Sequence, residues 1–171
     1  MIEFAEWLQA TPFSEAIQAA GWLVPLLQSI HILMIGVVFV SILTIALRVL
    51  ELVRMDQGFA DVWRRFAPWM WTGIVVMTLT GALLVAAEPV REFTSTSFWI
   101  KMLLLAVGIA SAIVFRRSLA PMVLAGDTAH EFSPGIKIGA IATVVLWLAI
   151  IFLGRAIAYD VEIWGVLSLS S

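Results

Sequence analysis

The chain has 171 residues, of which 62% are hydrophobic and 13% are charged, and its mean hydropathy is +1.04. Soluble domains are typically about half apolar and about a quarter charged, so lipid must cover the surplus apolar surface of this chain. The net charge of −2 argues against a nucleic-acid partner. The absence of cysteine excludes disulfides, thiolate metal sites and iron–sulfur clusters.

The N-terminal stretch MIEFAEWLQATP has the pattern of a short amphipathic helix in the membrane interface, with Phe4, Trp7 and Leu8 toward lipid. Thr11 is the expected N-cap of the helix that follows, and Pro12 suits the first helical position. We expect that helix to lead into the first membrane span, in which Pro25 is a candidate kink.

Four largely uncharged runs follow, and each reaches or approaches the roughly 20 residues that a helix needs to cross a bilayer. The predicted spans cover approximately residues 20–50, 66–88, 97–118 and 136–159. Because the runs are continuous and do not alternate, helices are favoured over a β-barrel. The predicted fold is therefore an all-α, integral membrane four-helix bundle with a short N-terminal interfacial helix, in one transmembrane domain over residues 1–171.

The basic residues predict how the spans are oriented. Seven lie in or beside the first and third connections: Arg48, Arg54, Arg64, Arg65, Arg116, Arg117 and Lys137. Three lie toward the opposite side: Arg91, Lys101 and Arg155. The positive-inside rule places the first and third connections in the cytoplasm. We therefore expect a multi-pass protein of a bacterial cytoplasmic (inner) membrane, with both termini on the periplasmic side.

Three ionisable residues interrupt the apolar runs: His31, Lys101 and Arg155. Counted from the basic residue at the inner end of each helix, they stand 17, 15 and 18 residues along it. At ~1.5 Å per residue, all three lie about 22–27 Å above the inner boundary, in one layer of the outer third of the membrane. Ionisable groups in hydrocarbon are costly unless they are paired or reach water, so this layer is the candidate functional site.

The residue types leave several roles open. His31 suits an interhelical hydrogen bond to Thr80 or to a carbonyl, an axial ligand of haem iron, or a proton carrier. Lys101 and Arg155 would either snorkel to the outer water or pair with an anion such as the haem propionates or a carboxylate substrate. Met34, three residues after His31, would allow a His–Met copper site, although methionine more often packs in a core.

Five stretches distributed over all four spans carry a family resemblance: WLVPLLQSIHIL (22–33), ALRVLEL (46–52), PWMWTGIVVMTLTGALL (68–84), FWIKMLLLAVG (98–108) and GRAIAY (154–159). In this order they resemble a bacterial family of small four-span membrane proteins known only as a domain of unknown function. The resemblance implies the four-span architecture and supplies no assigned activity.

A more distant similarity runs to HemJ-type protoporphyrinogen oxidases and CopD-like copper-resistance membrane domains. HemJ proteins place a histidine in the first span and a lysine early in a later span, and His31 and Lys101 stand at analogous places. The segment that characterises HemJ proteins after the first histidine is absent here, so the oxidase activity does not transfer. The similarity implies a bundle with a histidine and a lysine that is compatible with haem.

The leading functional prediction is a membrane protein that binds haem b and has a redox or electron-transfer role. The interior of a helical bundle is a normal site for a flat apolar macrocycle. His31 would bind the iron, and Lys101 or Arg155 would meet the propionates near the outer water. Tyr159 and Trp99 would close the outer rim.

The alternatives are a structural or assembly subunit of a membrane complex, and a small permeation protein for ions, protons or copper. Besides the lipid bilayer, the expected partners are further copies of the chain or a larger membrane complex. The other histidine, His130, falls in the third connection and is expected to be a solvated loop residue, so a bis-histidine cytochrome within one chain is excluded. The chain has no Walker A, HExxH or GxSxG motif.

Overall fold

The computed structural model describes residues 2–54, 56–125 and 132–165, which fold as helices with no strand among them. In chain order the elements are α1 (Ile2–Gln9), α2 (Pro12–Ala19), α3 (Leu23–Val49), α4 (Phe59–Ala87), α5 (Pro89–Phe93), α6 (Thr96–Ala125), α7 (Pro134–Ala156), the 3-10 turn η1 (Ile157–Tyr159) and α8 (Asp160–Trp164). The all-α fold predicted from the sequence is confirmed.

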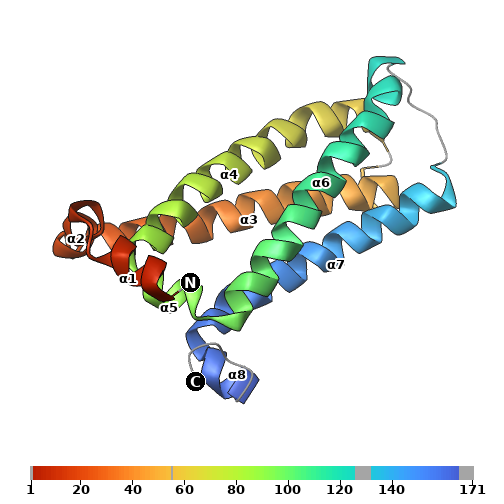
Figure 1. Cartoon of the computed structure of the whole chain (residues 1–171). Helices are drawn as coiled ribbons and strands as arrows, with labels where there is room; N and C mark the ends of the chain where they lie inside the picture. Colours follow the sequence, from red (N-terminus) through yellow and green to blue (C-terminus); the bar gives the residue numbers. More distant parts are fainter. Residues whose placement is uncertain (1, 55, 126–131, 166–171) are drawn as a thin grey trace.

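The helices α3, α4, α6 and α7 provide four segments that are long and apolar enough to cross a membrane. Helix α3 packs along α4, and α7 contacts both α6 and α3, whereas α4 and α6 touch only slightly (Figure 1). Large apolar side chains such as Phe152, which is 72% exposed, cover the outside of the bundle. Exposed apolar surface on this scale fits a lipid environment.

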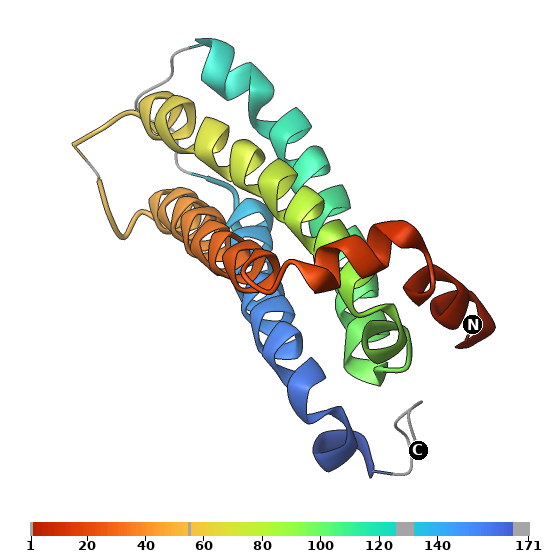
Figure 2. The ribbon, with the colours of Figure 1, turned by 90° about the vertical axis from the view of Figure 1, so that its left-hand side faces the viewer.

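The two ends of the bundle carry different connections. We name the end with α1, α5 and α8 the outer end, and the end where α3 leads into α4 the inner end, after the expected orientation. Figure 2 shows α1 and α8 at the same end of the spans. An even number of spans requires this arrangement.

His130, which the sequence places in the third connection, lies outside the described residues.

Two apolar clusters fill the bundle from its middle to its inner end. The middle cluster comprises Val38, Ile42, Met70, Ile74, Trp147 and Ile150. The inner cluster comprises Ile45, Ala46, Val49, Phe59, Leu119, Phe132 and Ala140. Gly73 allows α3 and α4 to approach closely, since a Cβ atom there would lie 2.5 Å from Cγ2 of Val38. Small residues have this role in many membrane helix pairs.

The N-terminal segment agrees with the sequence in part. The backbone N–H of Ser14 donates to Oγ1 of Thr11 at 3.3 Å, so the predicted cap of the helix that begins at Pro12 is confirmed. This helix ends at Ala19, however, so the expectation that it continues into the first span is wrong. Figure 2 shows α1 and α2 running across the outer end of the spans.

The prolines also differ from expectation. Pro25 lies in the first turn of α3, where its missing N–H removes no helical hydrogen bond, so it has no reason to kink the span. Pro68 lies inside α4, where one helical hydrogen bond must be missing.

Candidate functional site

His31 of α3 faces α4 in the outer part of the bundle. Its Nδ1 atom lies 2.8 Å from Oγ1 of Thr80, which is itself buried. The interhelical hydrogen bond to Thr80 expected as one role of His31 is therefore present. His31 as a whole is half-buried.

The contacts of Thr80 favour one tautomer of His31. The hydroxyl of Thr80 lies within donating distance of two backbone carbonyls, those of Val76 at 2.8 Å and Met77 at 3.3 Å. When it donates to either carbonyl, its oxygen accepts from Nδ1–H of His31, because a hydroxyl has one hydrogen to give. In this tautomer Nε2 is the unprotonated nitrogen, with a lone pair available to a metal or a proton donor.

Gly81 provides the space in which the imidazole lies. A Cβ atom at this position would lie 3.3 Å from Cε1 and 3.9 Å from Nδ1 of His31. The consecutive residues Thr80 and Gly81 therefore provide a hydrogen-bond acceptor and a flat contact for the same ring. Together they hold the orientation of His31.

Lys101 of α6 belongs to the same layer. Its Cδ lies 3.8 Å from where a Cβ of Gly154 in α7 would stand, so the aliphatic part packs against α7. The ammonium nitrogen lies 5.2 Å from the ring centroid of Phe98, a cation–π contact. Lys101 is half-buried and lies close enough to His31 to act on it electrostatically.

Glu92 in α5 is the acidic group associated with this layer, which the sequence analysis missed. Burial raises the pKa of its carboxyl, and the positive charges of Lys101 and Arg91 oppose that rise. Glu88, which stands nearer the end of the second span, forms an ion pair with Arg91. The i,i+3 spacing of these two residues indicates in the sequence that Glu88 forms an ion pair with Arg91.

Arg155 does not join the interior layer. Its side chain is exposed, and its guanidinium carbon lies 5.5 Å from the ring centroid of Tyr159 on the same helical segment. Tyr159 is 48% exposed. Of the two roles left open for Arg155, this exposed position fits snorkelling to the outer water.

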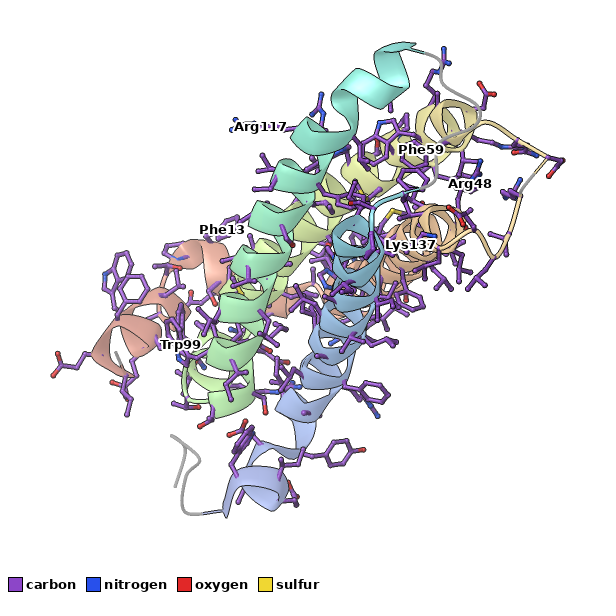
Figure 3. The ribbon with its side chains drawn as sticks, turned by 90° about the vertical axis from the view of Figure 1, so that its right-hand side faces the viewer. Phe13, Arg48, Phe59, Trp99, Arg117 and Lys137 are labelled. Atoms are coloured by element: carbon purple, nitrogen blue, oxygen red, sulfur yellow. The ribbon has the colours of Figure 1, made fainter. Side chains whose placement is uncertain are left out.

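Trp99 lies at the outer rim of the bundle, where the sequence placed it. It is 38% exposed, and its Nε1 donates to the backbone carbonyl of Phe93 at 3.0 Å. Its ring packs against Phe93 and Phe98, the residue that also contacts Lys101. Figure 3 shows Trp99 at the outer end of α6.

Asp160 holds the start of α6, and no local sequence signal indicated this role. It is 6% exposed, and its carboxylate accepts hydrogen bonds from Oγ of Ser95 and from the backbone N–H of Ser97, both at 2.8 Å. The Nε1 of Trp164 donates to Oγ of Ser97 at 2.8 Å. A carboxylate suits a helix N-terminus because it meets unpaired N–H groups and the positive end of the helix dipole.

The donor set of the layer is small. The described residues contain no group of three or more histidine, aspartate, glutamate or cysteine side chains able to hold a metal ion. A cavity of about 40 Å³, lined among others by Ile42, Trp63 and Phe115, lies toward the inner end of the bundle, away from His31. The layer therefore offers one imidazole nitrogen, one ammonium and one carboxyl.

The chain belongs to a protein family of unknown function, DUF6644, whose family model matches residues 4–160. No curated protein and no solved structure matches the chain. Family membership assigns no reaction, cofactor or partner, and the four-span architecture rests on the four long apolar helices themselves.

Proposed function

We propose that this protein binds haem b in the outer part of its bundle, through Nε2 of His31, and that it has a redox or electron-transfer role in the membrane. The observation that carries the proposal is the contact between Nδ1 of His31 and Oγ1 of Thr80, whose hydroxyl also lies 2.8 Å from the Val76 carbonyl. Metal-binding histidines commonly donate their other ring nitrogen in this way.

A single histidine favours a metal inside a macrocycle over a bare ion. A copper or zinc ion needs three or four protein ligands, and the described residues do not supply such a cluster. A porphyrin brings four nitrogen ligands of its own, so one axial imidazole suffices. The space over Gly81 that accepts the His31 ring gives this ligand a fixed orientation.

The chain's other residues would bind the periphery of the cofactor. Lys101 would pair with a propionate, since its ammonium is in the same layer as His31. Arg155, Tyr159 and Trp99 lie nearer the outer rim, where a second propionate would reach water. When bound, haem supplies one-electron redox chemistry.

The membrane orientation is part of the proposal. With the seven basic residues of the inner end in the cytoplasm, the His31 layer lies near the periplasmic face of a bacterial inner membrane. A redox partner would then approach from the periplasm. An alkaline phosphatase fusion after Ser171 would be active in that orientation.

A structural role is the second candidate, because the His31–Thr80 hydrogen bond also joins α3 to α4. In this case the polar layer would fix the helix register of a subunit that assembles with other copies or with a larger complex. A permeation role is less well supported, since the middle cluster around Val38, Ile74 and Trp147 is apolar. A proton or ion would find no polar route through it.

The test is an absorption spectrum of detergent-purified protein expressed with ample haem. We expect a Soret band in the wild type and its loss in His31→Ala. His130→Ala, at the chain's other histidine, is the matched control and should keep the band. Lys101→Met should retain more haem than His31→Ala, because water can partly replace a propionate partner.

A second pair of variants tests the tautomer argument. Thr80→Val keeps the shape of the side chain and removes the acceptor, so we expect haem affinity to fall by about 10–100-fold. Thr78→Val on the same helix removes a hydroxyl that donates only to the Ile74 carbonyl and should have no such effect. A wild type without a Soret band would overturn the haem proposal and leave the structural role.

A further inference from the structure

Two arginines meet on one aromatic ring at the inner end of the bundle. The guanidinium carbon of Arg54 lies 5.2 Å from the ring centroid of Phe66, and that of Arg65 lies 6.0 Å from the same centroid. The two guanidinium carbons are therefore at most about 11 Å apart. Like charges repel each other, and an anion bound by both guanidinium groups would offset that repulsion.

Neither guanidinium has an acidic partner among the described residues. Other basic groups at this end do: Arg64 pairs with Asp61 at 3.6 Å, and Lys137 pairs with Glu51 at 3.0 Å. Arg54 makes one long hydrogen bond to Oε1 of Gln57, at 3.4 Å, which leaves most of its N–H donors without a partner. The pair thus retains an uncompensated charge of about two units at neutral pH.

The backbone of Arg54 is held in an unfavourable conformation. Its φ is +52°, in the left-handed region that glycine adopts freely and that costs a branched or long side chain roughly 1–2 kcal/mol. The hydrogen bond from the N–H of Gln57 to the Arg54 carbonyl closes the turn in which this occurs. Glycine would fit the turn better, so the arginine side chain needs a reason to be there.

Neighbouring residues indicate the side from which a ligand approaches. Arg65 is exposed, and Trp69, one helical turn further into the membrane, is 62% exposed on the same face of α4. Exposed tryptophan at the end of a span lies at the level of the lipid headgroups. The exposed face that Arg65 shares with Trp69 would therefore lie beside the headgroup layer of the bilayer. Figure 3 shows Arg48, Phe59 and Lys137 gathered at this same end.

We propose that Arg54 and Arg65, supported by Phe66, form a binding site for the phosphate of an anionic phospholipid in the leaflet at the inner end. Guanidinium groups match phosphate oxygens with two parallel N–H donors, and contact with the Phe66 ring limits their motion. Clustered basic residues beside a span attract anionic lipids. Trp69 would contact the glycerol and upper acyl region of the same lipid.

The test compares lipid retention by native mass spectrometry of the detergent-purified protein. The probes are phosphatidylglycerol and phosphatidylcholine with identical acyl chains. We expect the wild type to retain phosphatidylglycerol preferentially. Arg54→Gly and Arg65→Gln should each reduce that preference about fivefold, the usual contribution of one basic residue near an anionic surface.

The choice of Arg54→Gly separates binding from folding. Glycine accepts a φ of +52°, so this variant should unfold at the wild-type temperature or above while losing lipid. Arg91→Gln is the matched control, because Arg91 is an exposed arginine at the outer end that already pairs with Glu88.

Three results would overturn the proposal. The first is equal retention of the two lipids by the wild type. The second is an equal loss in Arg91→Gln, which would indicate a general charge effect. The third is displacement of phosphatidylglycerol by an equal concentration of free glycerol 3-phosphate, which would indicate a site for a soluble phosphate.

Discussion

The outer and inner ends of this bundle differ in the partners that their buried and half-buried charged residues have. At the outer end, Lys101 and His31 are half-buried in one layer, and neither has an ion-pair partner among the described residues. At the inner end, Lys137 pairs with Glu51 across two connections, and Nε of the buried Arg48 donates to the Gln57 carbonyl at 3.1 Å. The middle apolar cluster separates the two ends.

The difference supports placing the proposed site in the outer layer. Hydrocarbon penalises an ionisable group without a partner, and Lys101 has only the nearby charge of Glu92 and no ion pair among the described residues, which favours an anionic ligand or access to water. Lys137 and Arg48 at the inner end have protein partners and are explained by packing alone. Arg54 and Arg65, by contrast, have no ion-pair partner among the described residues and share a contact with Phe66.

The largest effect is expected from filling the close contact in the middle of the bundle. Gly73→Val would force a side chain into Val38, which is fully buried, so we expect the free energy of unfolding to fall by about 3 kcal/mol. Gly139→Ala is the control, because nothing lies within 4 Å of a Cβ there. Unfolding in mixed micelles measures both. Equal stability of the two variants would mean that the middle cluster does not hold α3 against α4.

A smaller and more local effect is expected at the outer end. Asp160→Asn keeps the size of the side chain but removes the charge that accepts from Ser95 and from the N–H of Ser97, at a cost of about 2 kcal/mol. Amide hydrogen exchange should accelerate in the first turn of α6 and stay unchanged at the end of α3. Uniform acceleration at both ends would contradict a local role for this cap.

The smallest effects concern the pH dependence of stability, which we expect to have opposite signs at the two ends. Burial raises the pKa of Glu92, so the folded protein binds this proton more tightly than the unfolded chain does. Its contribution to stability is therefore lost as pH rises through the raised pKa, with a slope of at most about 1.4 kcal/mol per pH unit for one proton. Glu92→Gln should remove that loss, measured as the melting temperature between pH 4 and pH 7.

Glu51 should behave in the opposite sense. The hydrogen bond from Lys137 lowers the pKa of its carboxyl, so its contribution is present at neutral pH and is lost as pH falls below about 4.3, the ordinary glutamate value. Glu51→Gln should reduce the fall in melting temperature at acid pH. It should leave unchanged the loss of stability that Glu92 causes as pH rises. Identical profiles for the two variants would contradict the difference between the ends.

The sequence by itself determined the spans, the N-cap at Thr11 and the layer that contains His31 and Lys101. A continuous apolar run crosses a bilayer as a helix, because only a helix pairs every backbone N–H and C=O group within its own segment. The cap at Thr11 depends on neighbours three residues away. The partnership of His31 with Thr80 was also expected, because few polar side chains in the outer half of the neighbouring span can meet an imidazole.

Only the tertiary structure decided which polar side chains face inward and which partners they have. Arg155 has nearly the depth of Lys101 by residue count but is exposed, since depth follows from position along a helix whereas the direction of a side chain depends on how the helices pack. Asp160 caps a helix that begins 64 residues earlier in the chain, at Thr96. Arg54 and Arg65 meet on Phe66 where the connection between α3 and α4 has positive φ at Glu51 and Arg54. Contacts between distant segments and backbone exceptions of this kind leave no periodic pattern in the sequence, because they depend on how the helices pack.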